Sequence, residues 1–161
     1  MVEGIVSETR AEFAMLCDSA QVLAGKLYVL GGAWDRAVRW VSSGVGAPIP
    51  PTQFFIAAAF LVDWNDTNRI LEMRVAIEEL DERPPLFEMR AQVTVGRPPQ
   101  APPGNPLRHL VALPAAVLFP RAGTFALRSR IEAGPEYISR FQVIDAVIPY
   151  PQSPGPVDAG T

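Results

Sequence analysis

The sequence predicts an all-β fold, an antiparallel two-sheet β-sandwich of the immunoglobulin-like or C2-like kind with eight or nine strands. The first observation is the run 69–80, in which apolar side chains at every second position alternate with charged or small ones. A period of two is typical of a strand that buries one face, whereas a helix repeats about every 3.6 residues. The second observation is the placement of proline between such runs. A closed β-barrel is the alternative architecture.

Proline accounts for 17 of the 161 residues, about twice its usual share of roughly 5%. The prolines are absent from 1–47 and 52–83 and cluster at 48–51, 84–85, 98–106 and from 149 onward. Because proline cannot donate to a sheet ladder, the proline-free stretches are where strands can pair.

Nine strands are predicted in order along the chain. The first, at 11–19, alternates Phe13, Met15 and Cys17 with the residues between them. A helix over 11–20 is the alternative, but the segment that follows is strand-like. The other strands are expected at 21–31, 36–42, 53–63, 69–80, 86–95, 107–118, 123–132 and 137–147.

Two connections and a tail complete the predicted organisation. Residues 64–68 are rich in Asn and Asp, which suit a tight turn, so a hairpin between neighbouring strands is expected there. The proline-rich segment 96–106 is long enough to cross from one sheet to the other. Residues 1–148 are expected to form one domain, and 149–161 a proline- and glycine-rich tail.

Composition narrows the class of protein. A net charge of −3 without a cationic stripe argues against nucleic acid as a partner. The longest apolar run, 54–62, is shorter than the roughly 20 residues of a membrane-spanning helix, and acidic residues near the start do not suit a secretory signal. The single cysteine, Cys17, cannot form an internal disulfide. A cytoplasmic protein that does not bind membranes is expected.

No catalytic or cofactor-binding residues are assigned from the sequence. His109, the only histidine, falls on the expected buried face of its strand, and no serine lies in a nucleophile elbow. One histidine and one cysteine are too few for a zinc site. Calcium is the minor alternative, since four side chains with hard oxygen donors lie within six residues, but their spacing matches no EF-hand loop and turn formation is the favoured explanation: Asp63, Asn65, Asp66 and Asn68.

A set of aromatic and arginine side chains suggests an interaction surface. Such residues are enriched at protein interfaces, and two tryptophans bracket a short loop next to two glycines. The predicted interaction residues are Tyr28, Trp34, Arg36, Arg39 and Trp40. For the two tryptophans themselves a place in the core is favoured over the surface, because large aromatic side chains usually supply core area.

Several strings of residues resemble a known family. They are AEFAMLCD at 11–18, KLYVLGGAWD at 26–35, VGRPP at 95–99 with Pro103-Gly104, and Pro120 with Gly123. Over most of 11–145 the chain resembles a family of small bacterial proteins known only as a domain of unknown function. The resemblance implies a compact β domain and carries no catalytic residues.

The sequence therefore favours a non-catalytic binding module whose partner is another protein or a second copy of itself. Its working surface is expected at an unpaired sheet edge or around the loop 34–40. The alternatives are an enzyme with a site built from scattered Asp, Glu, Arg and His109, a calcium-binding sandwich, and a structural subunit of a larger assembly.

Overall fold

A computed structural model describes residues 8–42, 48–80 and 84–148. These residues contain nine β-strands, a short 3-10 turn η1 (Trp64–Asp66) and no α-helix. The strands are β1 (Arg10–Leu23), β2 (Lys26–Gly32), β3 (Arg36–Ser42), β4 (Thr52–Val62), β5 (Ile70–Glu79), β6 (Phe87–Thr94), β7 (Leu107–Val117), β8 (Gly123–Ile131) and β9 (Tyr137–Ile148). The described residues include no helix long and apolar enough to cross a lipid bilayer.

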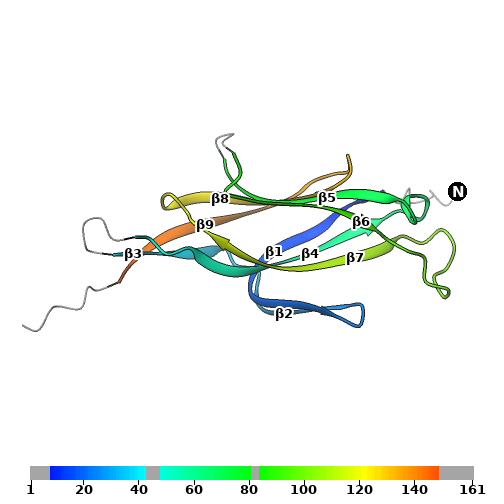
Figure 1. The fold of residues 1–161 in the computed structure, drawn as a ribbon, viewed down its shortest axis with the longest axis horizontal. Helices are drawn as coiled ribbons and strands as arrows, with labels where there is room; N and C mark the ends of the chain where they lie inside the picture. The colour runs from blue at the N-terminus through cyan, green and yellow to red at the C-terminus, as the bar shows by residue number, and fades with distance from the viewer. Residues whose placement is uncertain (1–7, 43–47, 81–83, 149–161) are drawn as a thin grey trace, which may run out of the picture.

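The strands form two sheets rather than one closed sheet (Figure 1). The four-stranded sheet, called sheet A here, has the order β2-β1-β4-β7, and the five-stranded sheet B has the order β3-β9-β8-β5-β6. All pairs are antiparallel except β3 with β9, which is parallel. The prediction of a purely antiparallel fold is therefore wrong at that pair, because β3 and β9 meet at the edge of sheet B without a direct connection.

The prediction of an all-β chain is confirmed, and each predicted strand overlaps an observed one. The largest difference in strand bounds is at the first turn, expected near residue 20 and found at Ala24-Gly25. Both residues have positive φ, 49° and 71°, as a two-residue type I′ hairpin turn requires. Alanine is uncommon in that conformation, so a turn at Ala24 is difficult to predict from residue type.

The two predicted connections have opposite outcomes. Residues 96–106 connect β6 in sheet B to β7 in sheet A, as expected for a crossover. The predicted hairpin at 64–68 is wrong, because β4 lies in sheet A and β5 in sheet B, so this turn also joins the two sheets. The predicted tail, 149–161, lies outside the described residues.

The core lies between the two sheets and takes every second side chain from their facing surfaces. Phe60, Ile56 and Val62 of β4 face Leu71, Val75 and Ile77 of β5 and Leu127 of β8, and all are buried. Three rings near one end, Phe119, Phe125 and Phe141, contact one another with centroids 5.0 to 6.1 Å apart. Burial of these side chains supplies the main favourable term for folding.

One part of sheet A leaves the two-layer arrangement. Residues 10–17 of β1 pair with β4, and Cys17 also pairs with Gly32 of β2, whereas residues 19–23 pair only with β2. The hairpin 18–32 therefore continues as an arm of two strands, seen in blue below the body in Figure 1. Its Leu27 packs beside buried Cys17 and Ala57 on the outer face of sheet A. This hairpin, residues 18–32, is called the flap below.

Candidate interaction surfaces

The flap carries a concentration of exposed apolar side chains. Leu30 is 70% exposed, Leu23 60%, Tyr28 48%, Val22 42% and Val29 38%. An exposed leucine alone is unremarkable on a protein surface, but a contiguous apolar group marks an interaction site. Five such residues within one hairpin make the flap the first candidate surface.

The flap also has a free backbone edge along β2. The two-residue turn makes Leu23 and Lys26 a hydrogen-bonded pair, so alternate residues of β2 turn their backbone groups away from β1. These residues are Leu27 and Val29, whereas Gly31 has a positive φ of 59° and departs from the extended conformation. In sheet A β2 is an edge strand, so no strand of the described chain pairs with that side.

Other sheet edges carry features that discourage pairing with another chain, and β2 has fewer of them. Pro114 is exposed in β7, and β6 presents Glu88 and Arg90. Proline and charged side chains are the usual means by which proteins protect an edge. In β2 the only charged residue is Lys26, at the turn.

A groove of about 750 Å³ lies between the flap and the outer face of sheet A. Its walls are mainly apolar, and Arg108 lies there in an ion pair with Glu12, with an Nη2–Oε1 distance of 2.7 Å. That pair keeps the pKa of the Glu12 carboxyl below its usual value. The apolar lining residues are Phe13, Met15, Leu27, Val29 and Leu110.

A second hollow, of about 680 Å³, lies beside β3 and brings together Trp34, Arg36 and Trp40 of the predicted set. The two tryptophans differ in burial. Trp34 is half-buried and contacts Phe54 edge-on, with ring centroids 6.1 Å apart, whereas Trp40 is 49% exposed. Trp34 thus contributes to the core, and Trp40 is available at the surface.

The other two predicted interaction residues lie elsewhere. Tyr28 belongs to the flap rather than to the tryptophan hollow. Arg39 is buried and used internally: it holds Asp145 through Nε–Oδ1 and Nη2–Oδ2 distances of 2.7 and 3.2 Å, and it donates to the carbonyls of Phe119 and Pro120. Its guanidinium keeps the pKa of Asp145 below the usual value. Arg39 is therefore an anchor of β3 and not a surface contact.

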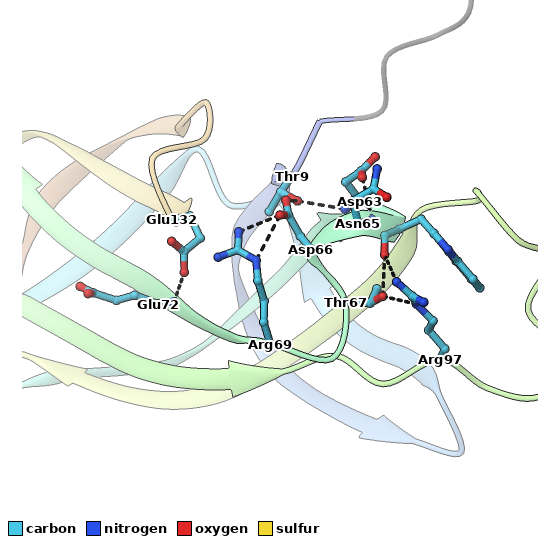
Figure 2. A network of polar contacts seen from close by, with 10 residues as sticks. Thr9, Asp63, Asn65, Asp66, Thr67, Arg69, Glu72, Arg97 and Glu132 are labelled. Atoms are coloured by element: carbon cyan, nitrogen blue, oxygen red, sulfur yellow. Dashed lines mark hydrogen bonds and ion pairs between the residues drawn. The ribbon is translucent and has the colours of Figure 1, made fainter.

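Three of the four residues considered for calcium, Asp63, Asn65 and Asp66, lie in the connection between β4 and β5 (Figure 2). Asp63 caps the 3-10 turn, accepting from the Asn65 amide at 2.8 Å. The Asp66 carboxylate accepts from the Thr9 hydroxyl and from Arg69 Nη2, the latter at 2.7 Å. These bonds lower the pKa of Asp66, the Thr9 bond most.

The backbone of the same turn is held by Arg97 (Figure 2). Its Nη2 donates to the Trp64 carbonyl at 2.7 Å, its Nε donates to the Thr67 hydroxyl, and its guanidinium lies 4.3 Å from the centroid of the Trp64 ring. Asn68 has a positive φ of 62° and donates its amide to the Val95 carbonyl. The polar side chains of this turn therefore hold a connection between sheets.

The described residues contain no group of three or more His, Cys, Asp or Glu side chains close enough to hold a metal ion. His109 is half-buried, and desolvation lowers its pKa. The buried Cys17 thiol has a raised pKa for the same main reason, which disfavours its reactive thiolate. Neither residue has the environment of an activated catalytic group.

The outer face of sheet B is charged and internally paired, in contrast to the flap. Arg74 bridges Glu78 and Glu88 across β5 and β6. Arg128 of β8 pairs with Glu78 at 3.0 Å and with Glu136 at 2.7 Å. The opposite charges of these ion pairs largely neutralise one another on that face.

Comparison with known proteins gives one family. Residues 12–144 match the model of a Family of unknown function (DUF6941). The chain belongs to this family. The family carries no assigned activity in its description, and no curated protein matches the chain.

Proposed function

We propose that the protein is a non-catalytic binding module that contacts a protein partner through the flap. The observation that carries this proposal is the exposure of five apolar side chains on a hairpin with a free strand edge. An extended partner segment can add to such an edge, taking affinity from backbone hydrogen bonds and specificity from neighbouring side chains. Covering these side chains would add roughly 1 kcal/mol or more for each one buried.

The surroundings of the two hollows support binding rather than catalysis. The hollow beside β3 is lined by the ionisable side chains of Asp35 and Arg36, together with aromatic, small and neutral polar residues. A catalytic site would require convergent acid, base or nucleophilic groups with shifted pKa values. The groove under the flap contains Lys26 and the Glu12–Arg108 ion pair, whose charges neutralise each other.

An immunoglobulin-like sandwich is the fold type that we include in this proposal. Its support is the strand order: β1-β4-β7 corresponds to strands A, B and E, and β9-β8-β5-β6 to strands G, F, C and C′. The hairpin strand β2 is then an addition between the first two standard strands. Binding modules of this architecture commonly present loops and added segments as contact surfaces.

We further propose that the protein acts in the cytoplasm on protein partners and not on nucleic acid or membranes. The support is the negative net charge of −3 and the single buried cysteine, which needs no oxidising compartment.

Affinity capture followed by a purified binding measurement tests this function. The full chain is tagged in its native cell, each captured protein is purified, and its affinity for the wild type is compared with that for Leu30→Asp. A charge at the most exposed flap residue should weaken binding at least roughly tenfold by desolvation.

A matched control variant shows whether the loss of affinity is specific to the flap. Ile70→Asp places the same charge at another leucine-sized, 65% exposed position, on sheet B, and should leave the affinity unchanged. Thermal unfolding of both variants should stay near that of the wild type, because neither residue is buried. Equal affinity of wild type and Leu30→Asp for every purified partner would overturn the flap as the binding surface.

A further inference from the structure

Several side chains of the hollow beside β3 keep free hydrogen-bond donors within the described residues. The indole N–H groups of Trp34 and Trp40 and the amide of Gln53 form no hydrogen bond there, and Arg36 forms no ion pair. Aromatic and arginine side chains are enriched where one chain segment binds another. The hollow therefore suits a ligand that offers apolar rings together with hydrogen-bond acceptors.

The backbone of β3 limits how a segment can bind there. β3 is the edge strand of sheet B, and its Val38 carbonyl accepts a hydrogen bond from the Thr52 hydroxyl at 3.1 Å. Because Thr52 occupies the middle of this edge, a strand added there could not form a continuous ladder. A polyproline II segment needs no ladder, since its proline rings pack on aromatic side chains and its carbonyls stay free to accept hydrogen bonds.

We infer that the hollow binds residues 149–161 of the same chain, with proline rings against the two tryptophans. These residues, called the tail, lie outside the described part of the structure. Four of the eight residues 149–156 are proline: Pro149, Pro151, Pro154 and Pro156. Pro151 and Pro154 have the P-x-x-P spacing of segments that bind aromatic-lined grooves as polyproline II. This binding is independent of the flap.

The end of β9 places the tail next to the hollow. β9, orange in Figure 1, pairs in parallel with β3, so that Ala146 lies opposite Trp40 and Ile148 opposite Ser42. The thirteen residues of the tail could extend roughly 40 Å as polyproline II. That length allows the tail to pass the end of β3, reverse, and return along the hollow, since Trp40 and Arg36 are roughly 13 Å apart along the strand.

The connection to β9 makes a weak contact sufficient. A segment joined to its binding site by a short linker has an effective concentration in the millimolar range. At about 1 mM, a contact with a dissociation constant of about 100 µM as a separate peptide would be about 90% formed within the chain.

The other proline-rich segment, 96–106, does not offer the same ligand. The Ala101 amide donates to the Pro98 carbonyl at 2.9 Å, and the Asn105 amide donates to the Pro102 carbonyl at 3.2 Å. Two successive β-turns therefore replace an extended conformation. This segment also leads into β7 beside Val62, at the end of β4 opposite to the hollow.

NMR order parameters of the backbone amides in the ¹⁵N-labelled full chain measure the binding. The amides of Tyr150, Gln152 and Ser153 should have values above about 0.7 in the wild type, against less than about 0.6 for a flexible segment. Trp40→Ala should lower them below about 0.6. The matched control is Tyr28→Ala, which removes an aromatic ring of nearly equal exposure, 48% against 49%, from the flap and should leave them unchanged.

Variants of the tail test whether proline is the recognised feature. Pro151→Ala combined with Pro154→Ala keeps the length and the attachment of the tail but removes two rings, so it should lower the order parameters as Trp40→Ala does. Ser153→Ala, between the two prolines, should leave them unchanged.

A spin label distinguishes binding within one chain from binding between copies. A nitroxide on Ser153→Cys should broaden the indole signals of Trp34 and Trp40 but not that of Trp64, which follows the far end of β4. The native Cys17 is buried and should not react. When the nitroxide is carried by an unlabelled copy mixed with ¹⁵N-labelled wild type, no broadening is expected.

Three results would overturn the inference. They are wild-type order parameters below about 0.6, values that Trp40→Ala or the double proline variant leaves unchanged, and equal broadening in the mixed sample, which would assign the tail to a second copy. None of these results changes the affinity of a flap partner for Leu30→Asp, so the proposed function is tested separately.

Discussion

Strands β2 and β3 are consecutive, equally long edge strands, and they are held in place by different means. Each has seven residues, and each lies at the edge of its sheet. β3 is fixed by Arg39, whose side chain bonds Asp145 and two backbone carbonyls, and Ala37 is buried. β2 has no such anchor in the described structure, and six of its seven residues are exposed.

The difference shows that residues that look alike in sequence can be buried in one edge strand and exposed in another. Both strands are rich in large apolar or aromatic side chains, which predict burial when taken alone. In β3 the apolar residues are accompanied by a polar anchor that orients the strand. In β2 the apolar residues remain exposed to solvent, so they add little to the free energy of folding. Their apolar surface is free to contact a partner.

Removal of the anchor of β3 should give the largest effect on stability. Arg39→Ala leaves the carbonyls of Phe119 and Pro120 without their donor, at a cost of about 2–4 kcal/mol in the free energy of unfolding. Urea denaturation measures this change. Arg39→Lys keeps the charge without the two-pronged geometry and should recover only part of the loss. A loss below about 1 kcal/mol for Arg39→Ala would contradict the anchor role.

Alanine variants of the two tryptophans near β3 should lose different amounts of stability in the same urea assay. Trp34→Ala removes a half-buried ring from Phe54 and should cost about 2 kcal/mol, less than the 3–5 kcal/mol of a fully buried aromatic residue. Trp40→Ala removes a ring that is 49% exposed and should cost less than about 1 kcal/mol.

A comparison of Trp40→Ala with Leu30→Asp tests which of the two surfaces binds the partner. Because no flap residue lines the hollow that contains Trp40, Trp40→Ala should leave the affinity for a flap partner unchanged. If Trp40→Ala abolishes binding and Leu30→Asp does not, the hollow beside β3 is the contact surface instead.

The contrast between these strands also explains how much the sequence could predict. The nine strands were predictable because alternation with period two depends on local burial of one face. Alternation does not specify which strand pairs with which, so it could not predict that β1 changes partner at Cys17 and forms the flap. The same limit explains why the turn at 64–68 was expected to be a hairpin although it joins two sheets.

The candidate surface was predictable only in part. Tyr28 and Trp40 were selected as aromatic residues and both are exposed, but they lie on different surfaces. Arg39 was selected by residue type, and its burial depends on Asp145, which is distant in sequence. The apolar flap residues Leu23 and Leu30 were missed because in an alternating pattern an exposed leucine is indistinguishable from a buried one.

The turn between β4 and β5 tests whether polar anchors elsewhere behave like that of β3. The Thr9 and Arg69 bonds lower the pKa of Asp66, so its ionised form stabilises the fold above the unfolded pKa of about 3.9. That contribution is lost as the pH falls through the lower folded value.

Asp66→Asn should therefore cost about 1–2 kcal/mol near neutral pH and progressively less below about pH 4. Urea denaturation of both proteins from about pH 7 to pH 2.5 gives the difference directly, since other carboxylates titrate equally in the two. A difference that is independent of pH would show that Asp66 acts through its shape rather than its charge. Since the flap contains no such anchor in the described structure, its exposure to solvent should change little over the same range, which hydrogen exchange of β2 can measure.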